Sequence, residues 1–150
     1  MASGDMTVFD EALAYMIDGG WASADNIKIA LITSALAPTS SDTTPILTDY
    51  TEVTPGGNYV GVTGAAGETL DTLANCVTEA AGVMTFDDTG ASVSWAQHAS
   101  NPADARYGLI LNASQASPQG IAFVDLGAVI DMTAGSLTIT WGGSGIFTIT

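Results

Sequence analysis

IKIALIT, at residues 27–33, is a segment in which only Lys28 and Thr33 are polar. A short and almost continuous apolar run that is rich in β-branched residues is typical of a strand covered on both faces. We therefore expect residues 27–33 to form a central strand of a sheet, with the rest of the chain packed around it.

Short β-favouring segments separated by turn residues follow this strand to the end of the chain. The clearest alternation is LTITW at residues 137–141, where every second residue is apolar, so one face is predicted to be buried. Residues 68–80 are ambiguous, because helical spacing and strand composition both fit them. The further predicted strands are 58–63, 83–86, 91–95, 106–112, 120–126, 136–141 and 146–150.

One helix is predicted close to the N-terminus. Thr7 is the expected N-cap, Asp10 completes a capping box, and Gly19 is the expected stop. Apolar residues recur at helical spacing between these signals, which predicts a helix that covers the core with one face. The residues of this stripe are Phe9, Ala12, Leu13, Met16 and Ile17.

These elements predict a mainly β fold in a single domain over residues 1–150. The expected architecture is an antiparallel β-sandwich or a barrel-like fold of about eight strands with one short N-terminal helix. Residues 1–6 are expected to be a flexible N-terminal segment, and residues 34–57 a long Pro/Ser/Thr loop or an arm that reaches a neighbouring subunit. The predicted structural core includes Phe9, Leu13, Ile17, Trp21, Trp95, Arg106 and Trp141.

The charge of the chain is strongly one-sided. Lys28 and Arg106 are its only basic side chains beside sixteen Asp and Glu residues, which gives a formal net charge of -14. Such a charge repels nucleic acid and anionic membrane surfaces, so neither is expected as a partner. The acidic surface either keeps the protein soluble in a salty medium or meets a basic partner. Arg106 is expected to pair with Asp104 or with Asp125 across the sheet.

The N-terminal sequence and the hydropathy pattern both favour synthesis in the cytoplasm. No apolar run approaches the ~20 residues of a membrane-spanning helix. The first residues are acidic, whereas a secretory signal begins with basic residues.

The inventory of reactive side chains predicts no catalytic, cofactor or metal site. His98 and Cys76 are the only His and Cys, whereas zinc sites and nucleophilic triads draw on several such groups. We expect His98 to lie in a solvated polar loop and Cys76 to be a small buried thiol.

One segment, DTGAS at residues 88–92, is similar to the D-T-G-A/S signature of aspartic proteases, in which two such loops share a proton. A chain with one loop must dimerise to form that pair. Asp87 stands where the family has an apolar residue, and the family's second element has no match around Arg106. The alternative is a turn in a hairpin between residues 83–86 and 92–95.

Five blocks of the chain together resemble a family. In order they are DNIKIALITS at 25–34, VSW at 93–95, ARYGLI at 105–110, LTITW at 137–141 and GIF at 145–147. This order is similar to that of small all-β virion proteins of tailed bacteriophages, of the capsid decoration or cement type. The resemblance covers most of the chain, and it departs at residues 61–82, where the Gly/Ala-rich stretch is longer.

The resemblance implies a structural protein without an active site. It implies a homotrimer, made in the host cytoplasm, that binds the outer surface of the capsid and clamps subunits of the major capsid protein. A tail or fibre protein or a carbohydrate-binding module is the alternative, and a dimeric aspartic protease is a distant one. The residues expected to contact partners lie in the N-terminal segment and in the long loop: Met1, Ser3, Met6, Pro38, Pro45, Tyr50 and Pro55.

Overall fold

A computed structural model describes residues 4–18, 20–62, 68–88, 90, 92–143 and 145–149. The elements within these residues are β1 (Met6–Val8), α1 (Asp10–Ile17), β2 (Asn26–Ile32), a 3-10 turn (Leu47–Asp49), β3 (Thr69–Thr72), α2 (Leu73–Cys76), β4 (Val77–Ala80), β5 (Val83–Phe86), β6 (Ser92–Trp95), β7 (Ala105–Asn112), β8 (Gln119–Ile130), β9 (Leu137–Thr140) and β10 (Phe147–Ile149).

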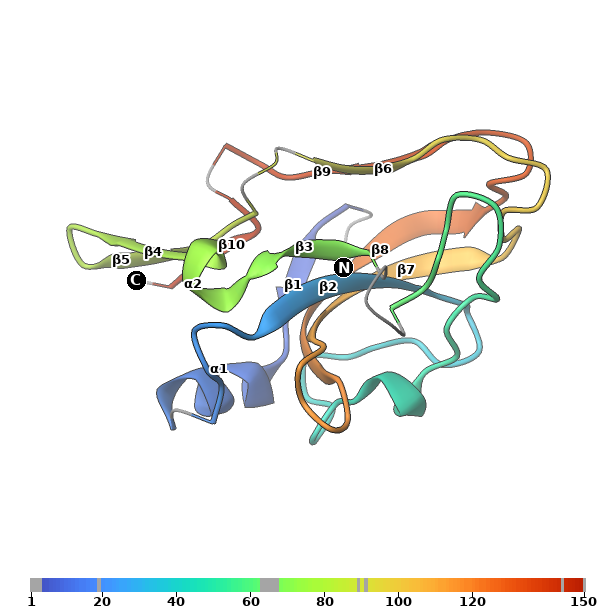
Figure 1. Cartoon of the computed structure of the whole chain (residues 1–150). Helices are drawn as coiled ribbons and strands as arrows, with labels where there is room; N and C mark the ends of the chain where they lie inside the picture. The colour runs from blue at the N-terminus through green and yellow to red at the C-terminus, as the bar shows by residue number, and fades with distance from the viewer. Residues whose placement is uncertain are drawn as a thin grey trace.

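The strands form three antiparallel sheets (Figure 1). The largest has the order β1-β8-β7-β2-β3, a second has the order β10-β5-β4, and β6 and β9 form a two-stranded ribbon. In Figure 1 this ribbon extends above the five-stranded sheet, and the β4–β5 hairpin projects to one side. The predicted mainly β fold is confirmed, because 43% of the chain is strand and 11% is helix and the sheets resemble a β-sandwich rather than a closed barrel.

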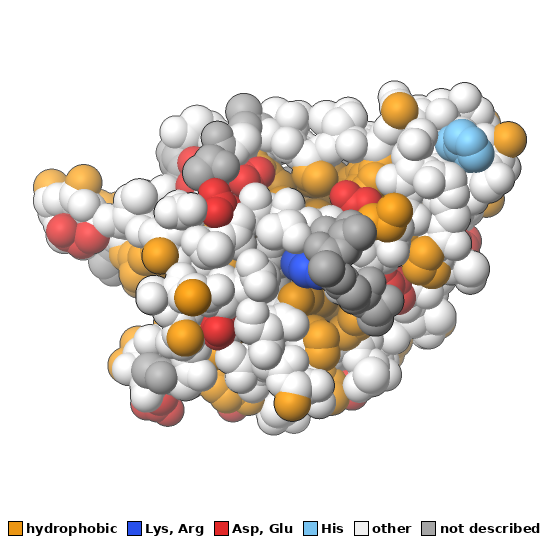
Figure 2. Space-filling view, viewed as in Figure 1, with side chains coloured by type: hydrophobic (Ala, Val, Ile, Leu, Met, Phe, Trp, Pro, Cys, Tyr) orange, Lys and Arg blue, Asp and Glu red, His pale blue; other side chains and the backbone are white. Residues whose placement is uncertain are grey.

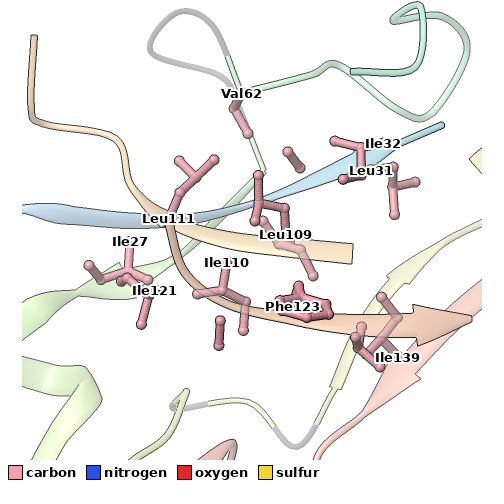
Figure 3. Close-up of a cluster of buried hydrophobic side chains, with 14 of the residues drawn as sticks. Ile27, Leu31, Ile32, Val62, Leu109, Ile110, Leu111, Ile121, Phe123 and Ile139 are labelled. Carbon is pink, nitrogen blue, oxygen red and sulfur yellow. The ribbon is translucent and has the colours of Figure 1, made fainter. Parts of the chain in front are cut away.

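The core is centred on β2, β7 and β8. This agrees with the prediction that residues 27–33, which contain most of β2, form a central strand. Ile27, Leu31, Leu109 and Phe123 are fully buried there (Figure 3). The β9 strand packs closely on this sheet, since a Cβ atom placed on Gly108 would lie 3.1 Å from the Cδ1 atom of Ile139. The glycine in β7 therefore makes room for the ribbon that covers the sheet.

The three tryptophan side chains belong to this core. Trp95 is 2% exposed and Trp21 and Trp141 are each 8% exposed. The predicted strand at 137–141 also has the expected alternation, because Leu137 and Ile139 are buried and the two threonines between and after them are exposed.

The predicted start of α1 is wrong. Thr7 lies in β1, opposite Phe123 of β8, and the N-cap position belongs to Phe9, which has no side-chain capping bond. The Phe9 amide donates to the Ile121 carbonyl at 3.0 Å, so the sheet continues up to the helix and leaves no place for a cap at Thr7. The predicted stop, Gly19, lies outside the described residues.

The predicted apolar stripe of α1 is only partly buried. Phe9 and Ala12 are fully buried and Leu13 is half-buried, but Ile17 is 84% exposed. Ile17 is the last residue of the helix, and its side chain is exposed to solvent. The assignment of Ile17 to the core is therefore wrong.

The loop at 34–57 packs on its own domain, in contrast to the predicted arm. It borders β2 beyond the end of β3, where the Val53 amide donates to the Leu31 carbonyl at 3.0 Å and the Thr33 amide to the Thr51 carbonyl at 2.9 Å. The Tyr50 ring lies 6.5 Å from the Phe9 ring, centroid to centroid. Hydrogen bonds to an otherwise open strand edge explain why the loop is held there.

Two further predicted features are corrected. Residues 58–62 of the predicted strand 58–63 form a turn with one bridge between Gly56 and Tyr59, because the positive φ of Gly57 bends the chain. The predicted hairpin between residues 83–86 and 92–95 does not form either. Instead, β5 pairs with β4 and β10, and β6 pairs with β9. The ambiguous segment contains both structures, since β3, α2 and β4 follow one another.

Candidate functional site

A cleft of about 540 Å³ lies between the outer strand of the five-stranded sheet and the outer strand β10 of the three-stranded sheet. We call it the edge cleft. Its lining mixes apolar side chains with polar groups and includes glycines from both sides. The residues that line it are Gly4, Asp5, Met6, Val124, Ile139, Thr140, Trp141, Gly142, Gly145, Ile146 and Phe147.

One side of the edge cleft is the free edge of β1. The Phe9 amide bonds to the Ile121 carbonyl in the register that pairs Met6 with Val124. Hydrogen bonding alternates along an antiparallel strand, so the amide and carbonyl of Met6 point away from β8. Among the described residues, no strand pairs with this side of β1.

The other side of the edge cleft is the free edge of β10. The Asp87 amide donates to the Cys76 carbonyl at 2.7 Å, which fixes the alternation of bonds between β4 and β5. By the same alternation Phe86 bonds toward β10, and the amide and carbonyl of Thr148 point away from β5. The edge cleft is thus bordered by two strands with outward-pointing backbone groups.

A smaller hollow of about 210 Å³ continues from the edge cleft along β9. The two share Gly4, Val124, Ile139 and Thr140, and the hollow extends to Leu126. The hollowed surface therefore follows the line between the five-stranded sheet and the ribbon.

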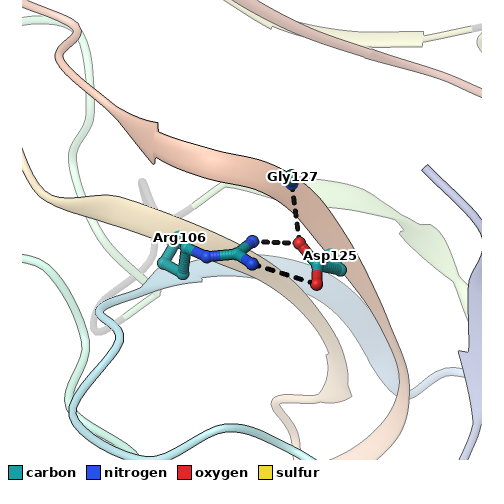
Figure 4. A network of polar contacts seen from close by, with 3 residues as sticks. All are labelled: Arg106, Asp125 and Gly127. Carbon is teal, nitrogen blue, oxygen red and sulfur yellow. Dashed lines mark hydrogen bonds and ion pairs between the residues drawn. The ribbon is translucent and has the colours of Figure 1, made fainter. Parts of the chain in front are cut away.

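Arg106 pairs with Asp125, which is one of the two predicted partners. Both nitrogen termini of the guanidinium contact the carboxylate, one of them at 3.1 Å, and the Gly127 amide donates to the same carboxylate at 2.6 Å (Figure 4). The guanidinium also lies 4.7 Å from the centroid of the Tyr107 ring. The Arg106 guanidinium and the Gly127 amide hold the pKa of Asp125 below its usual range.

Lys28, the other basic residue, is 7% exposed, and its Nζ atom donates to the Val62 carbonyl at 3.2 Å. Both basic side chains of the protein thus bind groups of their own chain. No further Lys or Arg exists to stand beside the remaining surface carboxylates. On the face shown in Figure 2, carboxylates are spread over several places and basic groups occupy little area.

Asp88, the residue of the protease-like segment, follows β5 and is half-buried. The Trp141 indole donates to its carboxylate at 3.3 Å, and the Asp88 amide donates to the side chain of Asp87. Thr89 and Ala91 of that segment lie outside the described residues.

The thiol of Cys76 is fully buried, as predicted. Burial, with the negative charges of Asp71, Asp88 and Asp87 as further causes, raises the pKa of Cys76 to about 12. His98 lies in an exposed loop, where its Nδ1 atom accepts a hydrogen bond from the Ser100 amide at 3.1 Å.

The predicted partner contacts are not brought together. Met1 and Ser3 lie outside the described residues, and Pro55 is exposed. Three residues of the long loop, Pro38, Pro45 and Tyr50, are buried by their own chain, because that loop packs on the core.

Met6, the remaining predicted contact, lines the edge cleft. It belongs to β1, and the Gly4 amide donates to the Asp125 carbonyl at 2.9 Å, so residues 4–6 are attached to the sheet. The predicted flexible segment is therefore wrong for residues 4–6.

Sequence reasoning missed the edge cleft. The signal that could have found one side of it is the β-favouring triplet Met6-Thr7-Val8, of which Met6 is predicted above to belong to the flexible segment and Thr7 to be the helix N-cap.

No family model, curated protein or solved structure matches the chain. Within the described ranges, no group of three or more His, Cys, Asp or Glu residues is placed to hold a metal ion. The described helices are also too short or too polar to cross a membrane.

Proposed function

We propose that this protein is a bacteriophage capsid decoration protein, which binds the outside of the capsid and stabilises it by clamping subunits of the major capsid protein. The observation that carries the proposal is the unbalanced acidic surface on a β body. Lys28 is buried and Arg106 pairs with Asp125, so neither basic side chain balances the rest of the acidic surface. A basic protein surface fits them, and a strongly acidic body also stays off DNA.

The resemblance to virion proteins supports the same proposal at the level of the fold. Its blocks coincide with packed strands, since DNIKIALITS contains β2, ARYGLI contains most of β7, and LTITW contains β9. The shared residues are thus those that build the body of the protein.

We further propose that the protein acts as a homotrimer. Three copies in one particle each need only modest affinity for the capsid, because binding of the first copy raises the effective concentration of the others. Light scattering coupled to size exclusion should give three times the 15.2 kDa mass of the chain. A dimer would instead favour the protease alternative, whose test is loss of proteolysis in Asp88→Asn.

The proposed function is tested with capsids of the phage that encodes this chain, prepared from a mutant that lacks the gene. Purified protein should sediment with these capsids and saturate at a fixed number of copies per capsid. It should also raise the temperature at which the capsids open. Capsids that already carry the protein are the control and should take up no more. Failure to bind the gene-deleted capsids would overturn the proposal. Binding to isolated tails would instead favour the alternative that the protein belongs to the tail.

A further inference from the structure

We propose that the edge cleft receives an extended segment of the major capsid protein that carries Lys or Arg, added as a strand along β1 and facing β10. This inference rests on the proposed capsid function and names the surface through which it acts.

The backbone groups at the edge cleft match an added strand. Met6 on one side and Thr148 on the other direct an amide and a carbonyl away from their own sheets, as the register of β1 and β10 requires. An extended peptide satisfies such groups by continuing the ladder, which is the common mode of peptide recognition at sheet edges. An edge left open invites pairing with another chain.

The lining of the edge cleft suits alternate apolar side chains of such a peptide. Ile139 and Trp141 come from the ribbon, and Phe147, which stacks on Phe86 with ring centroids 4.8 Å apart, comes from β10. Gly142 and Gly145 carry no side chain that would keep a peptide backbone at a distance. The volume of about 540 Å³ falls within the range of pockets that bind ligands.

Charge decides between a capsid segment and a second copy of this chain. Asp5 is the one charged residue of the cleft lining. A second copy offers no basic side chain for Asp5, because Lys28 and Arg106 both bind groups within their own fold. A segment with Lys or Arg on its solvent side gains from the acidic surface instead.

Hydrogen exchange, followed on the whole protein free and bound to gene-deleted capsids, locates the contact. We expect binding to slow exchange in the peptides that cover residues 4–8 and 146–149. The β4 edge, at residues 77–80, serves as an internal control and should exchange at the same rate in both states. Binding without slower exchange at 4–8 and 146–149 would overturn the cleft assignment and leave the proposed function intact.

A pair of matched variants tests the backbone of the edge. Thr148→Pro removes the amide that points away from β5 at the β10 edge, next to Phe147 of the cleft lining, and Glu79→Pro removes an outward amide at the opposite edge of the same sheet. Both side chains are exposed, and proline is tolerated at strand edges. Thr148→Pro should weaken capsid binding at least about fivefold, the loss expected for one hydrogen bond, and Glu79→Pro should leave binding within about twofold.

The other possible results also test the inference. Equal binding by the two variants, with both folded by circular dichroism, would contradict the added strand. Slow exchange at 4–8 and 146–149 in the concentrated protein alone would assign the cleft to a second copy and overturn the inference. If Thr148→Pro fails to fold, the exchange measurement on the unaltered protein still gives the answer. Absence of any capsid binding would overturn both the inference and the proposed function.

Discussion

Tyr59 connects three parts of the chain through its hydroxyl group. The hydroxyl donates to Glu52 at 2.7 Å and accepts from the Leu31 amide at 2.9 Å, at a point where β2 extends beyond β3. The Val62 amide donates to the same Glu52 oxygen at 3.0 Å. Burial and the neighbouring Glu52 carboxylate raise the pKa of Tyr59, so the hydroxyl keeps its proton and remains a donor.

We expect Tyr59→Phe to lower the free energy of unfolding by about 1–3 kcal/mol, because the buried Leu31 amide loses its partner. Urea denaturation measures the change. Tyr15→Phe is the matched control, since among the described residues no hydrogen bond involves the Tyr15 hydroxyl. An equal effect of the two substitutions would show that the Tyr59 hydroxyl has no special role.

The ion pair between Arg106 and Asp125 predicts how the stability of the protein changes at acid pH. Its pKa is lowered in the folded protein by Arg106, so the pair stabilises the fold above the ordinary pKa of an aspartate and loses this contribution as the pH falls through the lowered pKa. Asp125→Asn should therefore destabilise the protein at pH 7, and the difference from the unaltered protein should shrink below about pH 4. Urea denaturation at a series of pH values measures it. A difference that stays constant down to pH 2 would contradict the ion pair.

At the scale of elements, composition predicts strands better than it predicts their partners. The sequence predicts the positions of β2, β5, β6, β7, β9 and β10 within a few residues. Turn residues at 87–90 also favour a β5–β6 hairpin, yet β6 pairs with β9, where the hydroxyls of Ser94 and Thr138 lie 2.9 Å apart. Turn chemistry fixes where a strand ends, but pairing between distant segments depends on packing in the whole domain.

The same limit explains why the edge cleft could not be predicted. β1 is too short to show alternation, and its sequence also fits the start of a helix. Even a correct list of strands would not have placed β1 opposite β10, because the two strands lie near opposite ends of the chain and belong to different sheets.

Gly108 tests the packing of the ribbon on the sheet. A Cβ atom at this position would lie 3.0 Å from Val124 and 3.1 Å from Ile139, so Gly108→Ala should destabilise the protein by about 1–3 kcal/mol through overcrowding. Gly135→Ala is the control, since nothing lies within 4 Å of its added atom, and it should change stability by less than about 0.5 kcal/mol. Thermal denaturation of both variants measures the effect, and equal stabilities would show that the ribbon does not press on β7.

For the whole molecule, charge rather than a reactive side chain is the main indication of function. The formal charge of -14 favours a partner that carries basic groups. We expect capsid binding to weaken as the salt concentration is raised from about 50 mM to about 500 mM, because the attraction of a basic segment is screened. The sedimentation assay measures this. An affinity that is independent of salt would show that electrostatic attraction does not contribute to capsid binding.

The most direct measurement is the position of the protein in the virion. Electron cryomicroscopy of particles with and without the gene gives a difference density that is attributable to this chain. A capsid decoration protein predicts three-fold density on the outer surface at the junctions between capsomers, with the edge cleft turned toward the major capsid protein. Difference density confined to the tail, or no difference density at all, would contradict the proposed function.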